Sequence, residues 1–246
     1  MKILFTFFLL SSSISLAQKN MIAIIDDYSS PTSHGHRVTK SFTEYSGKLK
    51  FAPEIIELNI NGHREVDLVS LVEIAIDLKV KVINLSFGYT SLGTVEFDMN
   101  EYRVLKKASD AGIWIIVASG NDGKELSQTH SVYPCMYKIE NLVCVGAEEN
   151  KKRVNSSNYG SLVYLFANGT SGKENKSSFS APKVTQAIAL FYENTFGRKF
   201  SRDYLAYSVV KGTKGEDPIF NLGQFESQIQ YDRLVTTTVI KTRGPL

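Results

Sequence analysis

The sequence predicts an α/β fold with three layers: a doubly wound, mostly parallel sheet with helices on both faces. Three observations support this prediction. The apolar run over residues 22–25 is short and continuous, as in a strand that is buried on both faces. Residues 66–78 carry apolar side chains at helical spacing. Because strands and helices of these kinds alternate along the chain, we expect parallel strands joined by right-handed crossovers.

The same patterns place the individual elements in order. We expect strands over residues 22–25, 54–60, 80–85, 113–118 and 142–145. We expect helices over residues 34–45, 66–78, 102–111, 180–194 and 202–210, and Gly112 ends the third of them. Residues 234–240 are typical of a further strand, to which we assign no function. The sequence has no internal repeat and no clear linker, so we expect a single domain over residues 18–246.

The first 17 residues differ from the rest of the chain. Lys2 precedes a mostly apolar stretch over residues 3–10, and Ser15-Leu16-Ala17 places small residues where a signal peptidase reads them. The apolar stretch is too short to span a membrane. Residues 1–17 are therefore predicted to be a signal peptide that is cleaved near Ala17, with no membrane anchor. We expect a secreted or periplasmic protein whose first strand follows without an intervening propeptide.

Composition and charge argue against a nucleic-acid partner. The chain has 246 residues, 43% hydrophobic and 22% charged, and a net charge of only +3. Its Lys and Arg residues are scattered, whereas nucleic-acid-binding domains concentrate them on one face. We therefore expect no nucleic-acid partner, and we expect a monomer.

Two cysteines, Cys135 and Cys144, would meet an oxidising compartment after secretion. They could form a disulfide that closes a short loop. Alternatively, Cys144 is a small buried apolar residue within the strand over 142–145. With two cysteines and no nearby pair of histidines, the sequence predicts no metal site.

Polar residues at strand ends are the first candidates for chemistry, because ligands of such sheets bind outside the carboxyl ends of the strands. Asp26 ends the first strand, where it could cap a helix, bind a metal or orient a catalytic histidine. Asn84 and Ser86 lie at the end of the strand over 80–85. Asn121 follows the next strand within a Gly- and Asp-containing segment, where it could form a tight turn or direct its amide at an oxyanion.

Two further candidates lie at helix starts. His34 opens a predicted helix, and Gly35 beside it permits close approach of the backbone. Ser178 comes just before the helix over 180–194, whose Pro182 fits a first turn. A serine in this position is usually a helix cap. The free N–H groups of a helix start would also suit a hydroxyl whose adduct carries negative charge.

In combination, these segments resemble the subtilisin-like serine proteases. The similar segments are residues 22–27, 34–38, 82–88, 115–123 and 178–184. The second segment, His-Gly-His-Arg-Val, is similar to the His-Gly-Thr-His-Val block of that family, and the last is similar to its nucleophile block. The resemblance extends from residue 21 to about residue 230. The chain order Asp, His, Ser is the order that the resemblance requires.

The resemblance implies a secreted serine endopeptidase that acts on polypeptides and needs no cofactor. It implies that Ser178 is the nucleophile, that His34 is the general base and that Asp26 orients His34. Asn121 and the Ser178 N–H would bind the oxyanion. An extended substrate would lie as an added strand between two segments. These segments consist of Ser86, Phe87 and Gly88 on one side and Ala118, Ser119 and Gly120 on the other.

The chain departs from the family pattern at several positions. Only seven residues separate Asp26 from His34, where the family has tens. His36 and Arg37 replace the Thr and the second His of the histidine block, so His36 is a second candidate for the base. Lys176-Ser177 replaces the Gly-Thr before the nucleophile, and Lys183 replaces the His that follows the proline.

Two alternatives follow. The chain could be a catalytically degenerate subtilase that binds peptides or a partner protein. It could also be an unrelated nucleotide-binding α/β protein, but its Gly172-Lys173 pair fails the phosphate-loop pattern. Ala167 stands where that loop needs Gly, and Glu174 where it needs Ser or Thr.

Overall fold

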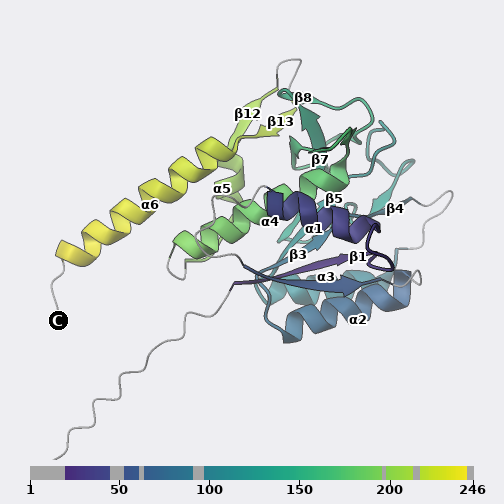
Figure 1. Ribbon diagram of the computed structural model, residues 1–246, viewed down its shortest axis with the longest axis horizontal. Coiled ribbons are helices and arrows are strands. Elements are labelled where there is room, and N and C mark those ends of the chain that lie inside the picture. Colours follow the sequence, from purple (N-terminus) through teal and green to yellow (C-terminus); the bar gives the residue numbers. More distant parts are fainter. Residues whose placement is uncertain are drawn as a thin grey trace, which may run out of the picture.

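The computed structural model describes residues 20–44, 53–60, 64–90, 97–195, 198–212 and 217–242 (Figure 1). A nine-stranded sheet lies at its centre, in the order β12-β13-β9-β7-β5-β3-β1-β2, with β8 paired to β7. Its strands are β1 (Met21–Asp26), β2 (Glu54–Asn59), β3 (Val82–Leu85), β5 (Trp114–Ala118), β7 (Leu142–Glu149), β8 (Lys152–Arg153), β9 (Leu165–Asn168), β12 (Val209–Lys211) and β13 (Pro218–Phe220). Within this sheet, β8 pairs antiparallel with β7 and β12 pairs antiparallel with β13, and the other described pairs are parallel. The predicted mostly parallel sheet is confirmed.

Helices cover both faces of this sheet. They are α1 (His34–Glu44), α2 (Arg64–Asp77), α3 (Met99–Asp110), α4 (Ser177–Asn194), α5 (Arg202–Tyr207) and α6 (Leu222–Thr242). Figure 1 shows α2 and α3 on one side of the sheet and α1 with α4 on the other. Two short ladders lie outside it, β4 (Tyr89–Thr90) with β6 (Val132–Tyr133), and β10 (Thr170–Ser171) with β11 (Glu174–Asn175).

Strand β1 shows why this layering forms. Its residues alternate between the two faces, so Ala23 and Ile25 pack in the core beneath α2 and α3. Ile22 and Ile24 pack in the other core, with α1 and α4. All four side chains are fully buried. Since burying a side chain of this size contributes roughly 1.5–3 kcal/mol, a strand apolar on both faces is stable only between two helical layers.

Helix α4 begins at Ser177, three residues before the predicted start. Ser178 is therefore the second residue of the helix rather than a residue before it. Pro182 lies in the second turn instead of the first, inside the helix. The early start places the hydroxyl of Ser178 on the first turn of α4.

Two predictions near the C-terminal end were wrong. The helix predicted over 202–210 ends at Tyr207, because the following residues form β12. There Val209 and Val210 pair with Phe220 and Ile219 of β13, and this pairing extends the sheet. The strand predicted over 234–240 lies within helix α6 instead. The β-branched residues of that run reduce helix stability by only a few tenths of a kcal/mol each, so a helix that starts at Leu222 can continue through them.

The predicted signal peptide, residues 1–17, lies outside the described residues. In the part of the chain that the structure describes, none of the helices combines the length and apolar character that a bilayer crossing requires.

Candidate active site

A cavity of about 810 Å³ opens at the carboxyl ends of β1, β3 and β5. Four separate elements bring the candidate catalytic residues to it. Asp26 comes from the end of β1, and His34 from the start of α1. Ser178 comes from the first turn of α4, and Asn121 from the turn after β5. The remaining lining residues are Asp27, Ser29, Ile60, Ser86, Phe87, Gly88, Thr90, Ala118, Gly120, Asp122, Val132 and Ser177.

Asp26 and His34 are in direct contact. The Nδ1 atom of His34 lies 2.7 Å from Oδ1 of Asp26, which also accepts a hydrogen bond from the Asp27 N–H at 2.7 Å. Asp26 is 2% exposed, whereas the side chain of His34 is 36% exposed. With Nδ1 engaged by the buried carboxylate, Nε2 is the ring nitrogen left for proton transfer.

His36, the second candidate for the base, lies in a different environment. Its Nδ1 atom is 3.2 Å from Oγ of Ser33, and its ring packs edge-on against Tyr28 at 5.1 Å between centroids. The structure therefore brings His34 to Asp26 and leaves His36 outside the cavity lining.

The short connection between Asp26 and His34 depends on Gly35. The N–H of Gly35 donates to the carbonyl oxygen of Asp27 at 2.8 Å. A Cβ atom at this position would lie 2.7 Å from that oxygen and 2.8 Å from the ring of Tyr28. Only glycine allows the helix to start this close to the end of β1.

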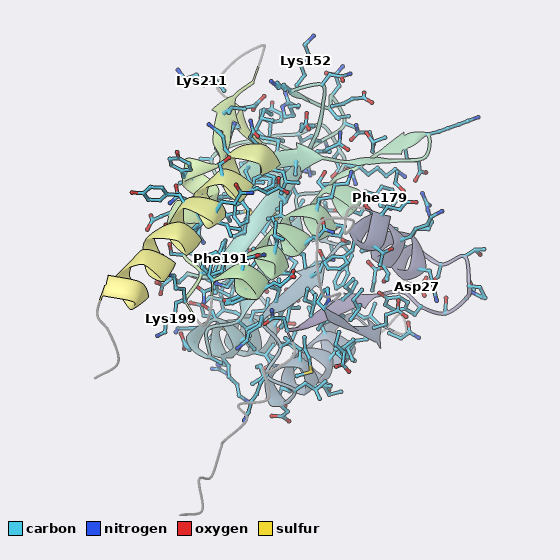
Figure 2. The ribbon with its side chains drawn as sticks, turned by 60° about the vertical axis from the view of Figure 1, so that its left-hand side comes forward. Asp27, Lys152, Phe179, Phe191, Lys199 and Lys211 are labelled. Carbon is cyan, nitrogen blue, oxygen red and sulfur yellow. A yellow bond between two sulfur atoms is a disulfide. The ribbon has the colours of Figure 1, made fainter. Side chains whose placement is uncertain are left out.

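Helix α1 also packs on α4, where Nε2 of Gln186 donates to the carbonyl oxygen of Phe42 at 3.2 Å. Figure 2 shows Asp27 and Phe179 at the same side of the molecule, next to α1.

The amide of Asn121 is oriented by the residue before the nucleophile. Its Oδ1 atom accepts from the N–H of Ser177 at 2.9 Å and lies 3.1 Å from the Ser177 hydroxyl. These contacts occupy the amide oxygen and leave Nδ2 as a donor on the other side of the group. The sequence predicted Asn121 but missed the part that Ser177 plays in holding it.

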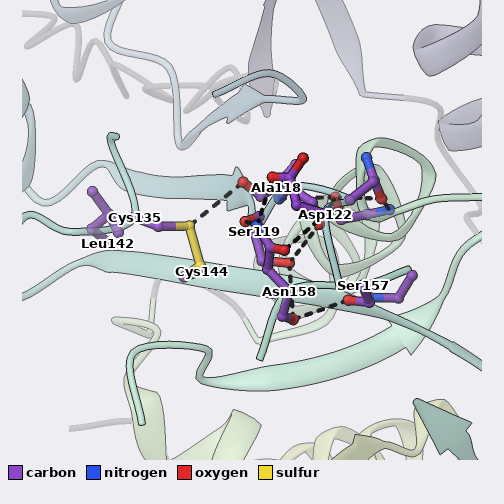
Figure 3. Close-up of a disulfide and its surroundings, with 12 residues drawn as sticks. Ala118, Ser119, Asp122, Cys135, Leu142, Cys144, Ser157 and Asn158 are labelled. Atoms are coloured by element: carbon purple, nitrogen blue, oxygen red, sulfur yellow. Dashed lines mark hydrogen bonds between the residues drawn. A yellow bond between two sulfur atoms is a disulfide. The ribbon is translucent and has the colours of Figure 1, made fainter. Parts of the chain in front are cut away.

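Asn158 organises the turn that carries Asn121. Its Oδ1 atom accepts from the N–H groups of Asp122 and Lys124, at 3.0 and 3.1 Å. Gly120 has φ +92°, and a Cβ atom there would lie 2.6 Å from Nδ2 of Asn158. The turn therefore requires glycine at this position. Figure 3 shows this turn beside a disulfide between Cys135 and Cys144. The Sγ atom of Cys135 lies 3.5 Å from the carbonyl oxygen of Ala118.

The cavity carries negative charge beyond Asp26. Hydrogen bonds from Ser29 lower the pKa of Asp27, so this carboxylate is ionised at neutral pH. The side chain of Asp122 is 47% exposed, and its Oδ2 atom lies 3.4 Å from Nε2 of His130. None of the lining residues, all of which belong to the described ranges, is Lys or Arg.

No group of three or more His, Cys, Asp or Glu side chains within the described ranges is placed to hold a metal ion.

Comparison with known proteins identifies the family. A sequence profile described as the subtilase family matches residues 54–219, which are 166 of the 246 residues. The chain belongs to the subtilase family. The matched range includes Asn121 and Ser178, and it starts after Asp26 and His34.

Subtilases among well-characterised proteins are distant relatives. The extracellular basic protease of Dichelobacter nodosus is 29% identical in an alignment of 153 residues that covers 54% of this chain and 24% of that protein. Subtilisin DY of Bacillus licheniformis is 31% identical in an alignment of 134 residues that covers 50% of this chain and 46% of that protein. The chain thus spans less than half the length of these relatives.

Solved structures show the same subtilase fold. The prenylagaramide maturation protease PagA superimposes with a TM-score of 0.67 at 19% identity, covering 86% of this chain and 94% of that chain. A lanthipeptide protease gives a TM-score of 0.69 at 17% identity, covering 86% and 87%.

One predicted substrate-binding residue of this subtilase is not available to a substrate. Ser119 is fully buried and is not part of the cavity lining. Its N–H donates to the carbonyl oxygen of Val145, and its own carbonyl accepts from Nδ2 of Asn158 at 2.9 Å. Because both backbone groups are engaged within the protein, Ser119 supports the turn rather than pairing with a peptide. The other predicted substrate-binding residues, Ser86, Phe87, Gly88, Ala118 and Gly120, all line the cavity.

Proposed function

We propose that this subtilase is a secreted serine endopeptidase that hydrolyses peptide bonds in polypeptides through an acyl-enzyme on Ser178. The observation that carries the proposal is the 2.7 Å contact between Asp26 and His34, at a cavity that Ser178 and Asn121 also line. The predicted signal peptide over residues 1–17 supports secretion, as does the similarity to the extracellular basic protease of Dichelobacter nodosus. Nothing in the mechanism requires a cofactor, and we propose that the enzyme acts as a monomer.

In this mechanism Ser178 Oγ attacks the scissile carbonyl while Nε2 of His34 takes its proton. Asp26 keeps the other proton of His34 on Nδ1 and stabilises the imidazolium that forms. His34 then donates a proton to the departing amine, which leaves the acyl group on Ser178. A water molecule, activated by His34 in the same way, attacks the acyl-enzyme and releases the product acid.

Two donors would stabilise the oxyanion of the tetrahedral intermediate. One is Nδ2 of Asn121, since Ser177 occupies the amide oxygen. The other is the N–H of Ser178, one of the first N–H groups of α4, which have no acceptor within a helix. Preorganised donors of this kind contribute about 100- to 1,000-fold each to turnover, which is the loss that removal of the oxyanion-hole Asn causes in subtilisin.

A polypeptide substrate would bind in extended form along the cavity. Phe87, Gly88 and Gly120 line it and come from segments that end strands of the sheet. Main-chain hydrogen bonds to such segments form with peptides of many sequences. The pockets for the peptide side chains then decide which sequences are preferred.

The test uses a fluorophosphonate probe and casein hydrolysis with the protein that starts after Ala17. Wild type should be labelled, and Ser178→Ala should not. Ser227→Ala, which changes an exposed serine of α6, should be labelled as wild type. His34→Ala should lower casein hydrolysis by at least about 100-fold, and His36→Ala should retain it.

Folded wild-type protein that neither reacts with the probe nor cleaves casein would contradict the proposal. If that protein still bound peptides, the catalytically degenerate alternative would replace it. Activity that is lost in His36→Ala but retained in His34→Ala would overturn the choice of base.

A further inference from the structure

A buried chain of polar side chains connects the end of β3 to the backbone of Ser178. Ser86 is 3% exposed, and its hydroxyl donates to the carbonyl oxygen of Ser178 at 2.8 Å. Nδ2 of Asn84 donates to Oγ of Ser86 at 2.9 Å. Oγ1 of Thr185 lies 3.0 Å from Oδ1 of Asn84 and 3.1 Å from the carbonyl oxygen of Ala181, and its proton can serve either. These hydrogen bonds therefore lead from Thr185 on α4 to the end of β3 and back to α4 at Ser178.

The position of Pro182 explains why the Ser178 carbonyl can accept this bond. In an α-helix the carbonyl of residue i accepts from the N–H of residue i+4. For Ser178 that residue is Pro182, which lies inside α4 and has no N–H. A buried carbonyl without a donor is unfavourable. The hydroxyl of Ser86 supplies the donor that the proline lacks.

The remaining bonds fix the direction of the Ser86 hydroxyl. Because Oγ of Ser86 accepts from Asn84, its own proton is directed towards Ser178. Hydrogen bonds that are linked in series polarise and strengthen one another. Asn84 and Thr185 are fully buried, so water does not compete for these bonds.

We propose that Ser86, oriented by Asn84, is a positioning residue for the nucleophile, an inference that rests on the proposed peptidase function. The carbonyl that it holds belongs to Ser178 itself, so the bond restrains the first turn of α4, which carries both Ser178 Oγ and the Ser178 N–H. Ser86 also begins the segment over 86–88 that lines the cavity. One hydroxyl thereby sets the position of the nucleophile relative to the wall on which a peptide would lie.

The test compares Ser86→Ala in two backgrounds, wild type and Pro182→Ala. Misplacement of a reacting group by about 1 Å can lower the rate by about 100-fold. We therefore expect Ser86→Ala to lower kcat for a peptide substrate by about 10- to 100-fold and to change KM by less than about threefold. The Pro182→Ala substitution restores an N–H four residues after Ser178. In that background, Ser86→Ala should change kcat by less than about threefold.

Ser41→Ala is the matched control. Ser41 is also a buried serine, and its hydroxyl donates to the carbonyl oxygen of Phe179 at 3.2 Å. The residue four positions after Phe179 is Lys183, which has an N–H. The Phe179 carbonyl therefore keeps its helical donor when Ser41 is changed. Ser41→Ala should therefore leave kcat within about threefold of wild type. Circular dichroism and thermal melting would establish that each variant is folded.

Three results would overturn the inference. The first is an equal loss of kcat on Ser86→Ala in both backgrounds, and the second is an effect on KM alone, which would indicate substrate binding. The third is an unchanged kcat in folded Ser86→Ala. If Ser86→Ala does not fold, Asn84→Ala tests the same chain of bonds, since a lowered kcat supports the inference and an unchanged kcat contradicts it. Wild type that fails to react with the fluorophosphonate would instead contradict the peptidase function.

Discussion

The disulfide between Cys135 and Cys144 should contribute a measurable part of the stability of this protein. The two cysteines are nine positions apart. In the chain-entropy treatment, closing a loop of this length stabilises the fold by about 2.6 kcal/mol at 25 °C. Both residues are buried, so truncation to alanine also removes packed sulfur atoms, at roughly 1 kcal/mol for each site. We expect Cys135→Ala to lower the free energy of unfolding by about 3–4 kcal/mol, and Cys135→Ala/Cys144→Ala by about 1 kcal/mol more.

The measurement is urea unfolding in a Ser178→Ala background, which prevents self-cleavage. The fluorescence of Trp114, the one tryptophan of the chain, reports the transition because its ring is buried against Phe200 in the core. Adding a reductant should shift the parent protein towards the single variant and leave both variants unchanged. A parent that is insensitive to the reductant would refute the reasoning, as would a single variant within about 0.5 kcal/mol of the parent.

Two further predictions concern charge. Burial lowers the pKa of Lys183 from 10.5 to about 8, against the opposing attraction of Glu148. The unfolded chain then binds more protons between about pH 8 and 10.5, so the free energy of unfolding should rise with pH there, by at most about 3 kcal/mol. Urea unfolding at pH 7.5 and 10.5 should show that Lys183→Met removes this rise, and a variant with the same pH dependence as its parent would contradict it. Asp27 and Asp122 should repel acidic side chains, so Asp27→Asn/Asp122→Asn should raise kcat/KM for an acidic peptide about three- to tenfold relative to a basic peptide of matched length, less so in high salt. An unchanged ratio of the two kcat/KM values would count against a role for these carboxylates.

Much of the fold could be predicted from local patterns. A continuous apolar run such as residues 22–25 requires cover on both faces, and its alternation with helical spacing leaves few arrangements other than a parallel sheet between helices. Short elements were missed because prediction from local patterns needs enough residues to show a period. Strand β9 has four residues and β4 has two, too few for a period to be visible, and both form because neighbouring strands are already in place. Residues 234–240 were misassigned because β-branched residues favour strands only where a partner strand is present.

The candidate site divides in the same way. The sequence by itself determined which polar residues end strands or begin helices, and so it identified Asp26, Asn121 and Ser178 as candidates. It favoured His34 over His36, but it could not show which ring contacts Asp26, because that contact depends on how closely α1 approaches β1 at Gly35. Nor could it show where the donors of Ser86 and Ser119 are directed. Hydrogen-bond partners are set by contacts across the fold, such as the one between Ser86 and Ser178, 92 positions apart, and only the tertiary structure brings such residues together.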